Sequence, residues 1–291
     1  MKDKFSATWV SHSSISDYLA CPRAYFLKNV YKDPKTGHKI QIVAPALSLG
    51  QVVHEVLESL SVLPTKDRFR ESLISKYNSA WKKVSGKKGG FSSEKQEADY
   101  RQRGEAMLRR VMSNPGPIAN LAVKIKEDLP YFWLSEEENI ILCGKIDWLE
   151  YLPDTNSVNI IDFKTSKTEE DSSSLQLPIY RLLAHYCQKY QTNGAAYWYL
   201  ELYDKLTPKT LPSLKEAEKQ VLEIARKVKL ARQLKKFTCP HGAKGCPHCR
   251  SFERILKGEG EFIGEDDMRR DLYYLPWDHA TTPESETEEI L

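Results

Sequence analysis

The stretch NIIDFKTSK, residues 159–167, starts as an apolar run and ends in charged side chains. The run predicts a buried strand on which Asp162 and Lys164 lie two residues apart. Because successive side chains of a strand point to opposite faces, both charges are expected on one face. A carboxylate beside an ammonium at the edge of a core is either a structural ion pair or part of a reactive site.

A second β-rich run, ILCGKIDWLEYL at residues 141–152, precedes this strand and is separated from it by the turn Pro-Asp-Thr-Asn. If these four residues form the loop of a hairpin, Leu152 pairs with Ser157. That register puts Asp147 opposite Asp162. A slip of one residue would move the two carboxylates to opposite faces of the sheet.

Two facing carboxylates about 5 Å apart repel each other unless a cation lies between them. Oxygen ligands favour Mg²⁺ or Mn²⁺, which bind a phosphate and lower the pKa of a water molecule. Lys164, on the same face, can orient that water or neutralise charge that grows in the transition state. The pattern therefore favours phosphodiester hydrolysis, and the alternative is a cross-strand ion pair at the end of a strand.

Two predicted helices offer further polar residues. The stretch ALSLGQVVHEVLESLSVL, residues 46–63, has apolar residues at helical spacing and predicts an amphipathic helix. His54 and Glu58, one turn apart, can both point toward a site beside the sheet, and a histidine is an acceptable metal ligand. A solvent-facing or capped histidine is the alternative for His54. Gln176 and Tyr180 have the same spacing on a later helix, where core packing explains the tyrosine equally well.

Composition and element order predict a mixed α/β domain. With 291 residues, 41% of them hydrophobic and 29% charged, the chain is typical of soluble globular proteins. Helical patterns dominate up to residue 127 and β-rich runs begin at residue 131, so an N-terminal helical part is expected to fold against an α/β domain. No apolar run is long enough for a signal peptide or a membrane span, so we expect a cytoplasmic protein without membrane contact.

The net charge of +3 conceals a basic body and an acidic C-terminal segment. Residues 261–291 contain ten Asp and Glu against two Arg, whereas residues 1–260 contain 41 Lys and Arg against 30 Asp and Glu. A basic body is compatible with a polyanionic partner, although lysine-rich solvated helices explain the charge equally well. We expect a folded domain over residues 1–258 and a solvated acidic tail over residues 259–291, with about the last ten residues disordered. The alternative is that the stretch YYLPW packs back onto the body or docks a partner.

Five short motifs follow one another along the chain: YLACPRAYFL, GQVVHEVLE, GKIDWLE, IIDFKTSK and QLPIY. In this order and spacing, from about Ser11 to Cys249, the sequence resembles the RecB-like branch of the PD-(D/E)XK nuclease superfamily. The resemblance implies a restriction-endonuclease-like fold, in which helices flank a central mixed β-sheet. It also implies a hydrolase that cuts DNA, often at single-stranded ends, with Mg²⁺ or Mn²⁺. Gln176 and Tyr180 would match an accessory motif that contacts the site or the DNA.

The resemblance also implies roles for the residues around the hairpin. His54, Asp147 and Asp162 would be metal ligands, with the backbone carbonyl of Phe163 as a further ligand. Lys164 would be the catalytic lysine. All these motif positions are intact, which argues against a relative that has lost its activity.

Four of the six cysteines are expected to bind metal rather than to form disulfides, because the protein is expected in a reducing compartment. The segment FTCPHGAKGCPHC contains two cysteines separated by two residues, a strong ligand signature, and the YLACPRAY motif supplies a fourth thiolate. The predicted ligands are Cys21, Cys239, Cys246 and Cys249. Cys143 and Cys187 are expected to be buried apolar residues.

One cysteine before the nuclease motifs and three after them resemble the iron-sulfur subgroup of the family, which includes AddB-type nucleases and CRISPR-associated exonucleases. In that subgroup a four-iron four-sulfur (4Fe-4S) cluster joins the N-terminal segment to the C-terminal one. The spacing departs from the subgroup, because the lone cysteine precedes the pair and Ile255 lies near the place of the last cysteine. Zinc is the alternative, held by four cysteines or with His241 or His248 in place of one. We favour iron-sulfur.

The sequence thus predicts a DNA exonuclease or flap-type nuclease that acts on single-stranded ends. It leaves the pathway open between DNA recombination repair, CRISPR adaptation and a mobile element. No Gly-rich phosphate loop ending in Lys-Ser or Lys-Thr occurs, so a helicase or a CRISPR adaptation protein would be a separate partner chain. The main alternative is a non-catalytic nucleic-acid-binding subunit with the same fold. A third hypothesis is a zinc-ribbon interaction module attached to an unrelated α/β domain.

Overall fold

The structure of the protein is a computed structural model that describes residues 3–171 and 173–276. The chain divides into two compact units. The first unit comprises Met1–His12, Gly50–Ala80 and Gln102–Lys227, and the second comprises Ser13–Leu49, Trp81–Arg101 and Val228–Leu291. Within the described residues, no helix is both long and apolar enough to cross a membrane.

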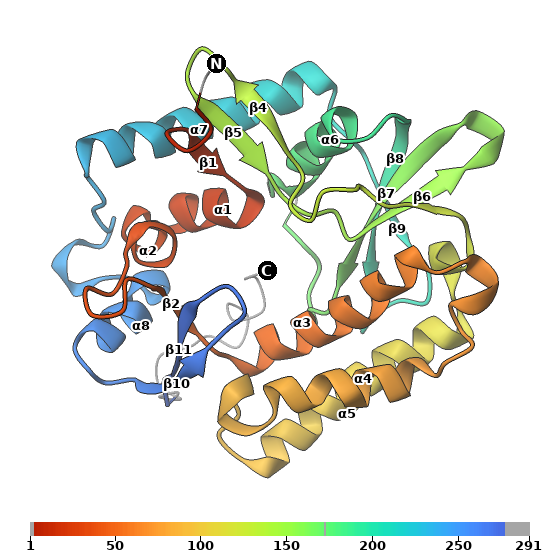
Figure 1. The fold of residues 1–291 in the computed structure, drawn as a ribbon, viewed down its shortest axis with the longest axis horizontal. Helices are drawn as coiled ribbons and strands as arrows, with labels where there is room; N and C mark the ends of the chain where they lie inside the picture. The colour runs from red at the N-terminus through yellow and green to blue at the C-terminus, as the bar shows by residue number, and fades with distance from the viewer. Residues whose placement is uncertain (1–2, 172, 277–291) are drawn as a thin grey trace. The chain divides into compact units, whose positions relative to one another are not determined.

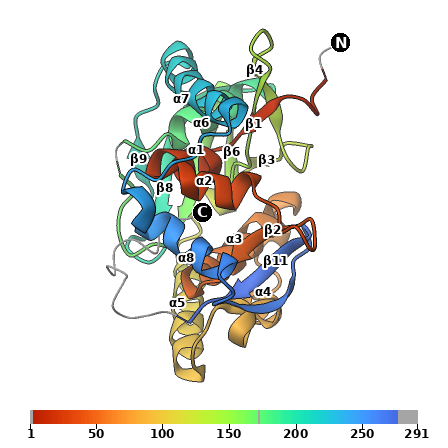
Figure 2. The same cartoon turned by 90° about the vertical axis from the view of Figure 1, so that its left-hand side faces the viewer.

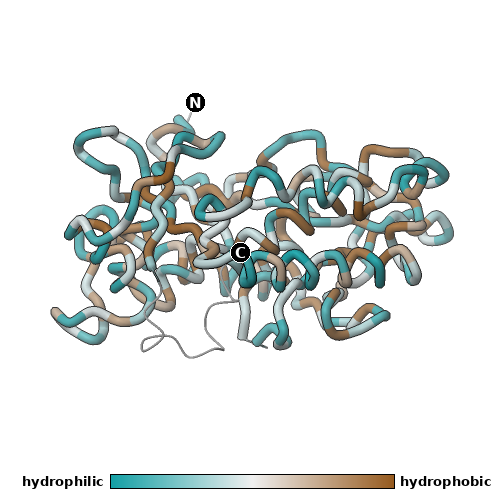
Figure 3. The backbone as a smooth tube through the Cα atoms, turned by 90° about the horizontal axis from the view of Figure 1, so that it is seen from below, coloured by the Kyte–Doolittle hydropathy of each residue, from teal (hydrophilic) through white to brown (hydrophobic). Residues whose placement is uncertain are grey.

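Helices and strands are labelled in chain order (Figure 1). The α-helices are α1 (His12–Ala20), α2 (Pro22–Tyr25), α3 (Pro45–Glu58), α4 (Leu73–Trp81), α5 (Glu94–Ser113), α6 (Gln176–Tyr186), α7 (Leu214–Leu234) and α8 (Pro247–Leu256). The strands are β1 (Thr8–Val10), β2 (Lys39–Ile42), β3 (Ala122–Val123), β4 (Tyr131–Ser135), β5 (Ile140–Cys143), β6 (Trp148–Leu152), β7 (Ser157–Lys164), β8 (Gln191–Tyr199), β9 (Thr207–Lys209), β10 (Glu261–Glu265) and β11 (Arg270–Tyr274). Hydrophobic and hydrophilic segments are interspersed along the backbone (Figure 3), as expected for elements that each bury one face.

A five-stranded sheet of the first unit, in the order β3-β6-β7-β8-β9, contains the predicted strand as β7. β7 pairs antiparallel with β6 and parallel with β8, so both of its edges are hydrogen-bonded (Figure 1). Its apolar side chains Ile160, Ile161 and Phe163 are buried. A mixed sheet with helices is therefore present, in agreement with the predicted α/β class.

The β6–β7 hairpin has the predicted register. Leu152 pairs with Ser157, and the same register continues along all of β6. The loop is a 3₁₀ turn, Pro153–Thr155, followed by Asn156, whose φ of 48° lies in the left-handed region that asparagine tolerates. The length of this turn determines which residues of β6 and β7 face each other. The predicted register of the hairpin is confirmed.

The β-rich run over residues 141–152 forms two strands rather than one. β5 ends directly before Gly144 and belongs to a separate three-stranded sheet of the order β1-β5-β4, whereas β6 begins at Trp148. The N–H of Gly144 donates to the carbonyl of Pro130 at 3.1 Å, and a Cβ on Gly144 would lie 2.9 Å from Leu183 Cδ1. Because glycine has no side chain, the chain passes close to α6 at this point and changes sheets.

Arg68 fastens the helical segments of the first unit to β6. Its side chain is 3% exposed, and its guanidinium donates to the main-chain oxygens of Leu60, Leu63, Ile118 and Asn120. The guanidinium carbon also lies 4.9 Å from the ring centroid of Trp148. Carbonyl dipoles and an aromatic face therefore stabilise this buried positive charge.

The second unit contains a three-stranded sheet in which β11 runs antiparallel to β10 and parallel to β2; Figure 2 shows β2 and β11 side by side. β10 and β11 lie within residues 259–291, so the expectation of a solvated tail over that whole segment is wrong. The fully buried carboxylate of Asp271 explains the difference, because it is hydrogen-bonded to Thr36 at 2.6 Å and to His38 at 2.9 Å. The end that was expected to be disordered lies outside the described residues.

Candidate active site and cysteine cluster

β7 and α6 bring four of the predicted site residues into contact. Gln176, the first residue of α6, donates from Nε2 to Asp162 Oδ1 at 3.0 Å and accepts from Lys164 Nζ at 2.6 Å. Its Nε2 also lies 3.3 Å from the hydroxyl of Tyr180, one turn further along the helix. Asp162 is 2% exposed and Gln176 is 3% exposed, so a buried amide fixes both charged groups of β7.

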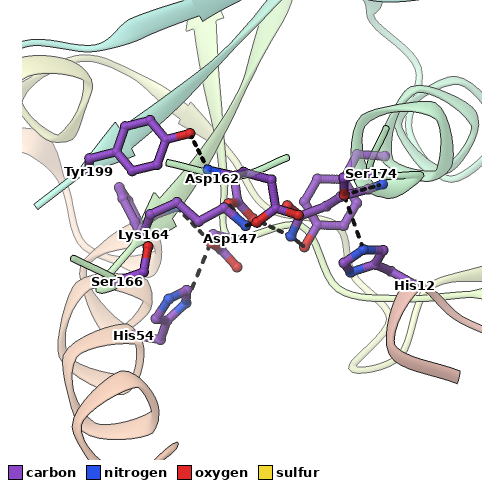
Figure 4. Close-up of polar contacts among 12 residues, drawn as sticks. His12, His54, Asp147, Asp162, Lys164, Ser166, Ser174 and Tyr199 are labelled. Carbon is purple, nitrogen blue, oxygen red and sulfur yellow. Dashed lines mark hydrogen bonds and ion pairs between the residues drawn. The ribbon is translucent and has the colours of Figure 1, made fainter. Parts of the chain in front are cut away.

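Asp147 directly precedes β6, at the same end of the hairpin as Asp162 (Figure 4). Its Oδ2 accepts a hydrogen bond from the N–H of Phe163 at 2.9 Å and lies 3.4 Å from His54 Nδ1. The two strands and α3 thus bring His54, Asp147 and Asp162 to one place. Phe163 contacts Asp147 through its N–H, and the role of its carbonyl oxygen as a metal ligand stays a prediction.

Glu58 forms a group of three potential ligands with His54 and Asp147. One donor atom of each residue lies within 4.8 Å of the other two. His54 Nδ1 is 3.8 Å from Glu58 Oε1, and the other oxygen of Glu58 pairs with Lys145. Sequence reasoning places Glu58 beside the site but not among the ligands, although its i+4 position relative to His54 is the signal for it.

Glu170, in the loop after β7, is a site residue that sequence reasoning misses. Its Oε2 lies 3.1 Å from Lys164 Nζ, and its N–H donates to the hydroxyl of Tyr199 at 3.0 Å. Further along the loop, the Ser174 hydroxyl lies 3.5 Å from His12 Nε2 (Figure 4). The loop contains several acidic residues and no periodic pattern, so only the fold shows which of them reaches the lysine.

Burial and neighbouring charges shift the pKa values of these residues. Burial, opposed by Lys164 and reinforced by Asp147, raises the pKa of Asp162 to about 7. Burial alone would raise the pKa of Asp147, but the charge of His54 and the hydrogen bonds outweigh it, and the pKa falls. Burial alone would lower the pKa of Lys164, but Asp162 and Glu170 outweigh it and raise the pKa. The raised pKa of Asp162 therefore arises mainly from burial, with the neighbouring charge of Asp147 as a smaller cause.

The chain matches the family model of the PD-(D/E)XK nuclease superfamily over residues 9–253, which is most of its length. The chain belongs to this superfamily. No curated protein matches it in sequence. The matched segment of the PD-(D/E)XK protein contains the β6–β7 hairpin, α6 and the four cysteines that were predicted to bind metal.

The side chains of the PD-(D/E)XK site fit a divalent metal ion. Asp162 Oδ2 is buried and lies 3.1 Å from Lys164 Nζ, but it accepts no hydrogen bond from the described part of the chain. A buried carboxylate oxygen in an ion pair without hydrogen-bond geometry retains the capacity to bind a cation. The carboxylates of Asp147 and Asp162, with the imidazole of His54, are the kind of donors that Mg²⁺ and Mn²⁺ accept.

The second unit of the PD-(D/E)XK protein holds a cluster of four cysteines. Their Sγ atoms lie within 4.8 Å of one another, all four residues are buried, and none forms a disulfide. The members are Cys21, Cys239, Cys246 and Cys249. The structure therefore brings together the whole predicted ligand set, whereas the side chains of His241 and His248 belong to exposed residues outside this group.

Main-chain N–H groups donate to the clustered sulfur atoms. The N–H of Ala24 donates to Cys21 Sγ at 3.4 Å, and the N–H of Cys246 donates to Cys249 Sγ at 3.3 Å. Burial, opposed by the N–H groups of Ala24 and Arg23, raises the pKa of Cys21 to about 11. A metal centre would supply the positive charge that buried thiols need in order to ionise.

Ile255, Cys143 and Cys187 differ in burial. Ile255, near the place of the last cysteine in the family pattern, lies in the core that surrounds the cluster. Cys143 is buried in the first unit and its Sγ donates to the carbonyl of Val10 at 3.5 Å, as expected for a structural residue. Cys187 is only half-buried, so the expectation of a buried residue is wrong at this position.

Proposed function

We propose that the protein is a metal-dependent deoxyribonuclease of the RecB-like branch, which hydrolyses phosphodiester bonds as an exonuclease on single-stranded DNA ends. Membership of the superfamily supports a nuclease that acts on DNA. The observation that carries the proposal is that Asp147 and Asp162 lie at the same end of the β6–β7 hairpin, with Lys164 beside Asp162 (Figure 4). Facing carboxylates suit a divalent cation, and an adjacent ammonium suits a reaction in which negative charge grows on a phosphate.

The ion would be held by Asp147, Asp162 and His54, with the carbonyl of Phe163 as a predicted further ligand. Glu58 is within reach, because it forms one group of potential ligands with His54 and Asp147, a group that does not include Asp162. A bound Mg²⁺ or Mn²⁺ supplies Lewis acidity and lowers the pKa of a water molecule. The Phe163 N–H fixes the orientation of Asp147. The lowered pKa of Asp147 keeps its carboxylate ionised near neutral pH.

Lys164 provides a fixed positive charge for the phosphate. Because its pKa is raised, it carries a proton near neutral pH and stabilises the negative charge of the transition state. Gln176 fixes the distance between Lys164 and Asp162, since its amide is bonded to both. Tyr180 accepts from the same amide and orients it.

For the cysteine cluster we propose a 4Fe-4S centre, with structural zinc as the alternative. Four buried sulfur ligands within 4.8 Å of one another support either metal centre. The centre would link the start of α2 to the segment that ends in α8. The visible spectrum of anaerobically purified protein separates the two: a brown sample that absorbs at about 400 nm indicates iron-sulfur, and a colourless one indicates zinc.

Cleavage of end-labelled DNA tests the proposed activity. The wild-type protein with Mn²⁺ is expected to shorten single-stranded oligonucleotides from an end. Asp162→Asn and Lys164→Ala are expected to lower the rate at least about 100-fold while DNA binding persists. Asp154→Asn removes an exposed carboxylate from the turn of the same hairpin and is expected to leave the rate unchanged.

A wild-type protein that binds DNA and cuts no form of it would contradict the proposal and favour the non-catalytic DNA-binding subunit. The proposed pathway is DNA repair or CRISPR adaptation. Since single-stranded ends must be generated for such an enzyme, we propose a helicase or a CRISPR adaptation protein as its partner.

A further inference from the structure

β2 of the second unit begins with a lysine that lacks a counter-charge. Lys39 is half-buried, and no carboxylate among the described residues pairs with it. In the parallel pairing of β2 with β11 its Cα partner is Arg270, so two cationic residues are neighbours across the strands. Arg270 has partners of its own, Asp266 Oδ2 at 2.6 Å and Gln41 Oε1 at 3.2 Å. The cross-strand neighbour of Lys39 is therefore a like charge, that of Arg270, which is unfavourable.

Two further cations act on Lys39. Burial lowers the pKa of Lys39, and the charges of Arg232, Lys32 and Arg270 lower it further. Arg232, near the end of α7, donates to the hydroxyl of Tyr25 at 3.3 Å and has no carboxylate partner among the described residues. A half-buried ammonium close to like charges is destabilising unless an anion binds beside it.

Aromatic rings adjoin the cationic cluster. The ring of Tyr25, whose hydroxyl binds Arg232, lies 6.1 Å from that of Phe237. Phe237 stacks on Phe26 at 5.0 Å with an interplanar angle of 28°, and Phe26 meets Tyr31 at 6.1 Å. Phe26, Tyr31 and Phe237 are half-buried, so part of each ring is accessible. Cationic side chains next to partly exposed rings form the combination that binds single-stranded nucleic acid.

From this arrangement we propose that Lys39, Arg232 and Lys32 bind a backbone phosphate of single-stranded DNA. The phosphate supplies the counter-charge that Lys39 lacks, and a base next to it stacks on the accessible rings. This subsite belongs to the second unit and shares no residue with the metal site of the first. The inference rests on the proposed function only in taking DNA as the polyanion, and it does not require cleavage.

Fluorescence anisotropy with the full-length protein and a fluorescein-labelled oligothymidine of about 20 nucleotides, without added divalent metal, tests the subsite. Lys39→Gln and Arg232→Gln are each expected to weaken binding about three- to tenfold at moderate salt. Each is also expected to reduce the slope of log K against log salt by roughly 0.7, the value for one lost phosphate contact on a single strand. Lys95→Gln is the matched control, because it removes an exposed lysine from α5 of the same unit.

Equal effects of Lys39→Gln and Lys95→Gln would overturn the inference, as would a wild-type protein that does not bind the oligonucleotide. Thermal unfolding of each variant shows whether a loss arises from misfolding, and Lys39→Arg, which keeps the charge, is expected to restore binding. Failure of that rescue in a folded variant would also count against the subsite. If the protein cuts DNA but Lys39→Gln does not weaken DNA binding, the subsite is refuted and the proposed activity stands. If Lys39→Gln weakens DNA binding but the wild-type protein cuts no DNA, the proposed activity is refuted and the subsite stands.

Discussion

Glu170 Oε2 lies 3.1 Å from Lys164 Nζ, which is also the distance from that nitrogen to Asp162 Oδ2. Two carboxylates therefore share one ammonium. When a metal ion engages Asp162, Glu170 and Gln176 still hold Lys164. Since Tyr199 in turn anchors the main chain of Glu170, the loop glutamate acts as a positioning residue for the lysine.

Glu170→Gln is expected to lower kcat about tenfold or more while KM stays nearly unchanged. The reason is that Lys164 loses one of the two charges that hold it in place and keep it protonated. Steady-state cleavage of labelled DNA measures both constants. Glu169→Gln, at the adjacent exposed position, is the matched control, and equal kcat values for the two variants would refute the positioning role.

Local sequence information was sufficient to predict the hairpin. A four-residue turn sets the register of β6 against β7, so Asp147 and Asp162 could be placed together from their numbers alone. The break between β5 and β6 was not predictable in the same way. It depends on the approach of Gly144 to Leu183, a residue of α6 that is distant in the chain.

The candidate site shows the same division between local and long-range information. His54, Lys164 and Gln176 follow from strand and helix periodicity, whereas Glu170 reaches Lys164 only through the path of an irregular loop. The strands of the acidic segment depend on Asp271, whose hydrogen-bond partner Thr36 is 235 positions away. A buried contact between residues so far apart in the sequence leaves no signal in the local charge pattern.

Arg68→Ala is expected to lower the free energy of unfolding by about 3 kcal/mol. The substitution leaves buried main-chain carbonyls without a donor and opens a cavity beside Trp148. Urea denaturation measures the change. Arg70→Ala removes a side chain that is 78% exposed and is expected to cost less than about 0.5 kcal/mol. Similar losses of unfolding free energy in both variants would contradict a stabilising role of the buried Arg68 side chain.

Glu97 is expected to make the stability of the second unit depend on pH. Burial alone would raise its pKa, but hydrogen bonds from Ser85, Gly86 and Trp81 outweigh it, so the pKa lies below its ordinary value of 4.5. A lowered pKa in the folded state means that the carboxylate stabilises the fold above about pH 4.5, and that this stabilisation is lost as pH falls through the folded pKa.

Glu97→Gln is therefore expected to lower stability by about 1 kcal/mol near neutral pH and by much less near pH 3. Thermal or urea unfolding across this pH range measures the difference between variant and wild type. A difference that does not change with pH would show that the charge of Glu97 has no part in it.

Cys21→Ser is expected to remove the visible absorption of an iron-sulfur protein and to lower the melting temperature by more than about 10 °C. The serine breaks the link between the start of α2 and the other three clustered cysteines. Cys187→Ser, which lies outside the cluster, is expected to change neither property. A Cys21→Ser protein with the spectrum and melting temperature of the wild type would rule out a metal centre at these four residues.

Calorimetric titration with Mn²⁺ tests most directly whether Asp147 and Asp162 bind one ion between them. The wild-type protein is expected to bind Mn²⁺ at this site, and Asp147→Asn and Asp162→Asn are each expected to weaken that binding at least about tenfold. Glu55→Gln, on the exposed face of α3, is expected to bind like the wild type. Unchanged Mn²⁺ affinity in both aspartate variants would contradict a metal site shared by Asp147 and Asp162.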